Sequence, residues 1–275
     1  MDNGIHHITD REYFSLDMPS SSGTKPLLTG TNAHLAHQRS QPQEESEAFT
    51  IGAYVHALCL SPEIIGTDFV RVGKIDRRTT EGKAKYADML ARAERTGARL
   101  ITDEQATLAQ AMADAVQAHP AWINLQRVVT QREVVAIGTV GGVQAKAKID
   151  AADAAFTIIV DLKTTQSAGL ADFARSAANF GYAHQAAWYR AVLESLGHTV
   201  QDVVFVCVEK TPPHLVAAYR LSDAAIEVAA RRLPDLVRRW CAVRDGDRSG
   251  YPETIQDIDL PAWAYSTAER NQTNE

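Results

Sequence analysis

Two neighbouring segments in the middle of the chain, 146–150 and 157–165, alternate between apolar and polar residues. This alternation predicts two β-strands joined by a short loop, because successive side chains of a strand point to opposite faces. Asp150, Asp161 and Lys163 fall on the polar faces, whereas the apolar residues of the second strand are predicted to face the core. If the strands are adjacent in a sheet, these three side chains meet at one end of it.

Other segments show the same kinds of periodicity. Apolar runs bounded by turn residues predict strands at 131–139, 143–150, 202–208 and 215–221, with Gly141 and Gly142 as a hairpin turn. Apolar residues at helical spacing predict helices at 32–38, 51–60, 83–97, 103–118, 170–197 and 223–243. Pro120 is expected to end the helix before it, Gly181 to break the next one, and Pro234 to kink or break the last.

The order of these elements predicts an α/β protein with a mixed central β-sheet flanked by helices. We expect a helical N-terminal part over 1–125, a core over 126–265 and a disordered tail over 266–275. A chain of 275 residues is long enough for such a core, and no apolar run approaches the length that spans a membrane.

Composition narrows the class of function only slightly. The formal net charge of −6 argues against a protein that coats nucleic acid without specificity, although a local basic groove remains compatible with it. The three cysteines are scattered and form no metal or disulfide pattern. Together with the absence of a signal-peptide pattern at the N-terminus, this predicts a cytoplasmic protein.

The polar end of the two central strands suits metal chemistry. Carboxylate oxygens are hard ligands for Mg²⁺, and a bound cation activates water and neutralises charge on a phosphoryl group. A lysine beside them can orient the water or stabilise the transition state, so Asp150, Asp161 and Lys163 indicate metal-assisted phosphodiester hydrolysis. The alternative is a surface hairpin with an Asp161–Lys163 ion pair, which the two strands alone favour because Asp-x-Lys is a common triplet.

Further candidates carry weaker signals. His56 shares a helix face with Gly52 and Leu60, where a lone histidine is more often a core residue than a ligand. A basic stretch at 71–85 suits phosphate contacts, or is simply a solvated loop. Four residues separate Gln185 from Tyr189, which places both on one face of a helix.

These motifs, in this order, resemble the PD-(D/E)XK nucleases, and within them the phage-type exodeoxyribonuclease VIII (RecE-like) group. The resemblance covers most of the chain and rests on residues 52–58 with 61–63, 76–83, 147–150 with 161–165, 182–189 and 208–213. Asp161 stands in place of glutamate before the lysine. The three unclustered cysteines argue against the iron–sulfur branch of the family.

The resemblance implies a role for each matching residue. Metal ligands are expected to be His56, Asp150, Asp161 and the backbone carbonyl of Leu162, with Lys163 positioning the attacking water. Gln185 and Tyr189 are expected to steady the active-site strand and the DNA end, and Glu133 to supply an acidic group near the metals. The expected DNA contacts are Arg77, Arg78, Thr79, Lys83, Lys148, Thr164 and Thr165.

The resemblance also implies a reaction and partners. We expect two Mg²⁺ or Mn²⁺ ions per active site, 5′-to-3′ digestion of linear double-stranded DNA, a ring-shaped homo-oligomer, and a single-strand-annealing recombinase as partner in phage-type recombination or repair in a bacterial host. A structure-specific or restriction-like endonuclease of the same fold is one alternative. A catalytically silent DNA-binding subunit is the other, and the intact set of acidic ligands argues against it, because carboxylates held close together need a cation.

Overall fold

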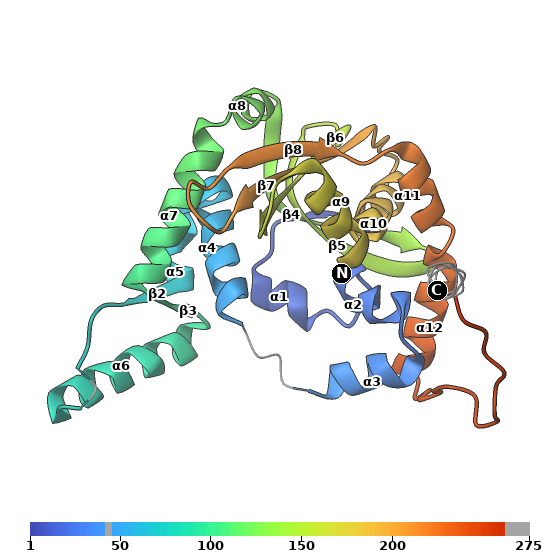
Figure 1. Cartoon of the computed structure of the whole chain (residues 1–275), viewed down its shortest axis with the longest axis horizontal. Coiled ribbons are helices and arrows are strands. Elements are labelled where there is room, and N and C mark those ends of the chain that lie inside the picture. The colour runs from blue at the N-terminus through green and yellow to red at the C-terminus, as the bar shows by residue number, and fades with distance from the viewer. Residues whose placement is uncertain (42–45, 77, 262–275) are drawn as a thin grey trace, which may run out of the picture.

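The computed structural model describes residues 1–41, 46–76 and 78–261. Its centre is a six-stranded sheet in the order β1-β4-β5-β6-β7-β8 (Figure 1). The strands are β1 (Gly4–His6), β4 (Val129–Val140), β5 (Val143–Asp153), β6 (Ile158–Thr165), β7 (Asp202–Glu209) and β8 (Val216–Arg220). β6 and β7 run parallel, and every other neighbouring pair of this sheet runs antiparallel. The predicted mixed sheet is therefore confirmed.

The parallel pair β6–β7 requires a crossover, which α9 (Leu170–Asn179) and α10 (Tyr182–Glu194) provide. Gly181 separates the two helices with a left-handed backbone (φ 68°), as the sequence predicted. The helices that follow β8 are α11 (Asp223–Ala230) and α12 (Leu233–Arg244). The kink or break expected near Pro234 is therefore a break, and Pro234 lies in the first turn of the second helix.

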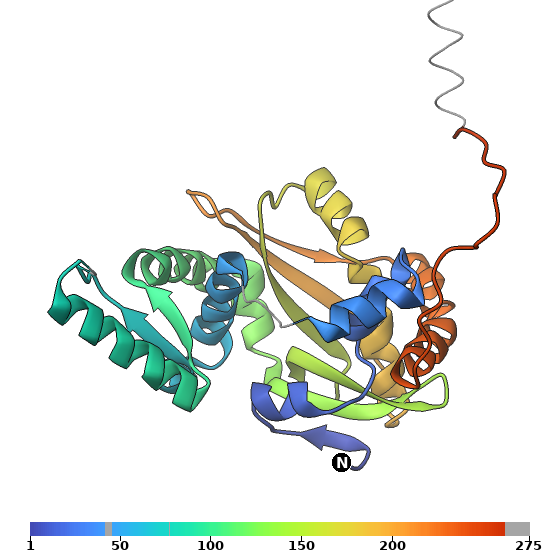
Figure 2. The ribbon, with the colours of Figure 1, turned by 90° about the horizontal axis from the view of Figure 1, so that it is seen from below.

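The N-terminal part of the chain is not wholly helical, and it does not lie apart from the sheet. β1 pairs with β4 as an edge strand of the central sheet. A second sheet of two parallel strands, β2 (Phe69–Val72) and β3 (Arg99–Thr102), carries α6 (Thr80–Thr96), and Figure 2 shows this unit projecting to one side. The other short elements are α1 (Asp10–Ser15), α2 (Ser21–Thr24), η1 (Lys25–Leu28), α3 (Asn32–Ser40), η2 (Pro62–Ile64) and α5 (Ile65–Asp68).

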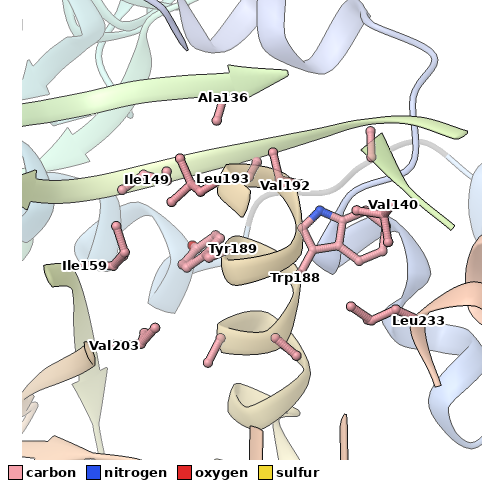
Figure 3. Packing of buried hydrophobic residues seen from close by; sticks show 14 of the residues in the cluster. Ala136, Val140, Ile149, Ile159, Trp188, Tyr189, Val192, Leu193, Val203 and Leu233 are labelled. Carbon is pink, nitrogen blue, oxygen red and sulfur yellow. The ribbon is translucent and has the colours of Figure 1, made fainter. Parts of the chain in front are cut away.

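Helices cover both faces of the central sheet. One hydrophobic cluster joins the sheet to α10 and α12 and includes Trp188 and Leu193, both fully buried (Figure 3). A second cluster lies on the other face, beneath α4 (Glu47–Leu60) and α7 (Asp103–Ala118), and includes Leu162. A further helix, α8 (Pro120–Gln126), follows α7. No helix of the described residues is long and apolar enough to cross a bilayer.

Candidate active site

A cavity of about 330 Å³ lies between α1, α4 and the central strands β4, β5 and β6. Phe14 and Phe49 contribute apolar wall, and both are about half exposed. The polar side chains that line the cavity are Asp10, His56, Asp68, Arg99, Glu133, Lys148, Asp150, Lys163 and Thr164. Most of the residues proposed from the sequence to act in catalysis or to bind metal are therefore in or next to one hollow, although they come from distant parts of the chain.

Three potential metal ligands gather in this cavity. One ligand atom from each of His56, Glu133 and Asp150 lies within 4.8 Å of the other two. His56 Nδ1 is 3.4 Å from Asp150 Oδ2, because α4 packs against β5 and β6 with its Gly52–His56 face toward the cavity. Two carboxylates and an imidazole form a donor set that suits a divalent cation.

The backbone is irregular at Glu133 and Asp150, whose side chains both line the cavity. β4 and β5 pair at Arg132↔Ala151 and at Val134↔Ile149, whereas Glu133 and Asp150 between them are not paired. Glu133 has a positive φ of 48°, which is rare for a residue with a side chain. Across this point β5 changes face: Ile149 packs in the cluster with α10, and Ala151, two residues later, packs in the cluster with α4.

Lys148 ties Glu133 to the N-terminal helix. Its Nζ is 2.8 Å from Glu133 Oε2 and is hydrogen-bonded to Asp10 of α1. Asp10 in turn lies 3.4 Å from Arg99 of β3. Although burial alone lowers the pKa of Lys148, the charges of Glu133 and Asp10 outweigh it and raise that pKa. Lys148, expected to be a DNA contact, is thus held as a cation between two carboxylates.

Asp161 and Lys163 of β6 form a second polar group beside the first. Asp161 is almost wholly buried (1 % exposed), and Lys163 Nζ lies 2.5 Å from its Oδ1. Asp161 Oδ2 accepts hydrogen bonds from Gln185 Nε2 (2.7 Å) and from Tyr189 Oη (3.1 Å) of α10. Burial lowers the pKa of Lys163, but Asp161 and Asp150 more than offset it, so the pKa is raised and the amine stays protonated.

Asp150 links the two groups. The backbone N–H of Leu162 donates to Asp150 Oδ2 at 2.9 Å, where the β5–β6 ladder ends after Ala151↔Val160. Burial raises the pKa of Asp150 to about 6, with the charges of Asp161 and Glu133 adding to the rise and His56 opposing it. Carboxylates that are held together in this way are stabilised by a bound cation, so the residues fit a divalent metal.

The structure distributes the expected metal ligands over both groups. His56 and Asp150 belong to the cluster of three, where Glu133 stands as the third donor. The charge of Asp161 helps to raise the pKa of Asp150, so Asp161 lies close to this cluster. The carboxylate oxygens of Asp161 themselves contact Lys163, Gln185 and Tyr189. Leu162 lies at the boundary, with its N–H on Asp150.

The expected DNA contacts are divided between two places. Thr164 lines the cavity, and Thr165 behind it is buried and donates to the Ser167 carbonyl. Thr79 caps α6, accepting from Gly82 N–H, while Arg78 and Lys83 are exposed there. Figures 1 and 2 place the start of α6 at the outer tip of the molecule, far from β6. Arg77 lies outside the described residues.

Four polar residues of the site were not singled out from the sequence: Asp10, Asp68, Arg99 and Tyr182. Asp10 and Arg99 reach the cavity from α1 and β3, elements that were not predicted. The capping box formed by Thr9 and Glu12 is a sequence signal that would have revealed α1. Tyr182 offers no local signal, because its role follows from the position of its ring below Lys163, 5.1 Å from Nζ.

A mixed sheet whose central strands present carboxylates and a lysine to one cavity defines a domain of the PD-(D/E)XK nuclease superfamily. The chain belongs to the family described as "PDDEXK-like domain of unknown function (DUF3799)", whose model matches residues 20–260.

A crystal structure described as a "Putative exonuclease" from Eubacterium rectale is similar in fold. It has a TM-score of 0.62 at 14% identity, with 95% of this chain and 98% of that chain covered. The crystal structure of SSO0001 matches with a TM-score of 0.31 at 15% identity, covering 78% of this chain and 84% of that chain. No match was found among curated proteins.

Proposed function

We propose that this protein is a metal-dependent exodeoxyribonuclease that hydrolyses linear double-stranded DNA from its ends in the 5′-to-3′ direction. The observation that carries the proposal is the cluster of His56, Glu133 and Asp150 beside the Asp161–Lys163 pair in one open cavity. The family supports a nuclease, and the description of the Eubacterium rectale structure supports an exonuclease. The 5′-to-3′ direction comes from the resemblance to exodeoxyribonuclease VIII.

His56, Glu133 and Asp150 would hold Mg²⁺ or Mn²⁺, which supplies an activated water and a counter-charge for the phosphoryl oxygens. Lys163 Nζ carries the proton and the positive charge that the transition state needs, facing the cavity with Asp161 as its anchor. Gln185 and Tyr189 fix Asp161 from behind through Oδ2, which leaves Lys163 little freedom to move. A second ion in the same site would require Asp161 as a ligand.

The test compares labelled linear duplex DNA with a closed circle of the same sequence, in Mg²⁺ and in EDTA. We expect Mg²⁺-dependent early release of a 5′ label, with the circle intact. Lys163→Ala should reduce the rate at least a hundredfold while the unfolding midpoint stays close to that of the parent protein. The substitution Arg127→Ala, at an exposed cation that follows α8, serves as the control.

Other outcomes assign the protein differently. Nicking of the circle would make it a structure-specific or restriction-like endonuclease, because an exonuclease needs an end. DNA binding without turnover of either substrate would make it a catalytically silent subunit. Early release of the 3′ label would reverse the proposed direction.

The proposed assembly follows from the same resemblance: a ring-shaped homo-oligomer around DNA, acting in the cytoplasm with a single-strand-annealing recombinase. Light scattering of the purified chain tests the ring-shaped homo-oligomer, and a monomer at micromolar concentration with and without DNA would exclude it. Co-purification with an annealing protein from the same genome tests the recombinase partner.

A further inference from the structure

Two stacked aromatic rings, with a lysine at each end, form a row that leads from the active site to the surface. Lys163 Nζ lies 5.1 Å from the centre of the Tyr182 ring. The rings of Tyr182 and Phe180 stack with centroids 6.1 Å apart and an interplanar angle of 28°. Lys25 Nζ lies over the outer ring, 5.3 Å from the Phe180 centroid. Phe180 is 53% exposed, so the row reaches the surface at this ring.

Several contacts hold Lys25 at this place. His184 of α10 lies with Nε2 3.0 Å from Thr24 Oγ1 and 3.1 Å from the Ser21 carbonyl oxygen, which fixes α2 and the η1 turn that follows. At Gly181 the chain needs a positive φ of 68°, and an added Cβ would approach Leu28 Cδ1 to 2.9 Å. The η1 turn that carries Lys25 is thus packed closely against the junction of α9 and α10.

The charge at Lys25 is not neutralised by the protein. Across the described part of the chain, no carboxylate forms an ion pair with Lys25 within 4.0 Å. Partial burial and the positive charge of Lys163 both lower the pKa of Lys25. Two ammonium groups that repel each other beside an exposed ring are stabilised by a ligand with a negative group and a flat apolar group. A nucleotide has both.

We propose that Lys25 and Phe180 bind an unpaired nucleotide of the strand that enters the active site, with the base stacked on Phe180 and a phosphate on Lys25. Stacking on an aromatic side chain is tolerant of sequence, because every base has a π-face. This inference deepens the proposed function, since it names single-stranded DNA as the form of substrate held next to Lys163. It does not require the direction of cleavage to be the proposed one.

The first test measures binding of a short single-stranded oligonucleotide with the fluorescent base 2-aminopurine at one position after another, in EDTA so that no cleavage occurs. We expect quenching at one position, lost in Phe180→Leu together with about a tenfold weaker affinity, and retained in Phe180→Trp. Tyr251→Leu is the matched control, because Tyr251 is also exposed (73%) but packs on His34 away from the cavity.

The second test concerns the phosphate. Lys25→Gln should lower the slope of log affinity against log salt by about 0.7, the value for the loss of one phosphate contact with a single strand. Arg127→Gln removes an exposed cation beyond α8 and should leave the slope unchanged.

Unchanged affinity and quenching in Phe180→Leu, or an unchanged salt slope in Lys25→Gln, would overturn the proposal. So would a change in oligomeric state in Phe180→Leu without a change in DNA binding, because Phe180 would then be a contact between copies. Failure of the proposed function shows separately: the unsubstituted protein would not release nucleotides in Mg²⁺, while its metal-free binding would still report on Lys25 and Phe180.

Discussion

Glu133 shows how a single backbone conformation can produce a site. Its positive φ of 48° places a side chain where glycine is normally preferred, at the unpaired step between β4 and β5. The carboxylate then joins His56 and Asp150, and the strained backbone is held by Lys148 through the Glu133 side chain. Strain of this kind costs on the order of 1–3 kcal/mol and is typical of functional positions.

The first prediction compares two substitutions of Glu133. Both Glu133→Ala and Glu133→Gly remove the carboxylate, but only glycine relieves the backbone strain. We therefore expect Glu133→Gly to be more stable than Glu133→Ala by about 1 kcal/mol in chemical denaturation without metal. Both should bind Mn²⁺ more weakly than the parent by calorimetry. Equal stability of the two variants would show that the backbone at this position is not strained.

His184 gives a prediction for pH at the same scale. Burial lowers the pKa of His184 to about 4, against an ordinary value of 6.5, so the folded protein holds the ring neutral. The unfolded chain binds the proton more readily between these values. Stability from this group is present above pH 6.5 and is lost as pH falls toward 4, by at most about 3 kcal/mol.

The measurement is the free energy of unfolding against pH for the parent protein and for His184→Gln. Carboxylates also change the free energy of unfolding below pH 6. The effect of His184 is therefore measured as the difference between the two curves. The parent should lose its advantage over His184→Gln as pH falls from 6.5 to 4. A constant difference over that range would mean that the ring does not remain neutral in the folded state.

At the scale of elements, α10 is the helix that supports the site. It supplies Gln185 and Tyr189 to Asp161, and its Trp188 Nε1 donates to the Lys146 carbonyl of β5 at 3.0 Å. Figure 3 shows Trp188, Tyr189, Val192 and Leu193 pointing from this helix toward the sheet. Any change in the distance between α10 and β4 is therefore expected to move the anchor of Lys163.

Gly138 tests this dependence. It lies on β4 beneath α10, and an added Cβ would meet Ser195 Oγ at 2.4 Å and the Val192 carbonyl oxygen at 2.5 Å. We expect Gly138→Ala to destabilise the protein by about 1–3 kcal/mol and to lower nuclease activity, because the helix must move outward. Gly66→Ala is the control, since a Cβ at Gly66 meets nothing within 4 Å. Full stability of Gly138→Ala would indicate a looser α10.

Local patterns predicted most of the core elements, and long-range contacts explain what they missed. The alternation of apolar and polar residues at 157–165 corresponds to β6, and Gly181 separates α9 from α10. Pro120 was interpreted as a helix end, although it also begins α8, because proline is favoured in a first turn. β1 is only Gly4–His6 and is stabilised by β4, far away in sequence.

The sequence predicted which residues belong to the site better than it predicted how they are arranged in space. The spacing of Asp150, Asp161 and Lys163 pointed to the right strands, but strict alternation placed Asp161 on an open polar face. Helices in fact cover both faces of the sheet, and Asp161 is buried beneath α10. The change of face at Asp150 coincides with the positive φ of Glu133, and no periodicity in the sequence reveals either.

At the scale of the whole molecule, the site lies where α4 meets the central sheet, with which it shares one hydrophobic cluster. α4 contributes His56 and packs on α7, whereas β4 and β5 contribute Glu133 and Asp150 to the cavity. A cation bound between them would link α4 to the sheet. Binding that occurs only in the folded state raises the stability of the whole protein by an amount that grows with the logarithm of the ligand concentration.

The last prediction follows from this linkage. Mn²⁺ at a hundred times its dissociation constant should raise the free energy of unfolding by about 2.7 kcal/mol, and EDTA should reverse the effect. His56→Asn should remove most of the gain at the same Mn²⁺ concentration. His37→Asn is the control, because His37 is exposed on α3. Equal stabilisation of both variants would place the metal elsewhere.

The position of α1 has a practical consequence for anyone who prepares this protein. Asp10 and Phe14 form part of the cavity wall, and Lys146 Nζ donates to the Tyr13 and Leu16 carbonyls at the end of the same helix. The N-terminus lies beside the edge strand β1 (Figure 2), and Met1 does not line the cavity, so a purification tag attached there leaves the cavity wall in place. A shortened protein that starts after α1 would instead lack one wall of the active-site cavity. Inactivity of that fragment would therefore not show that the intact chain is inactive.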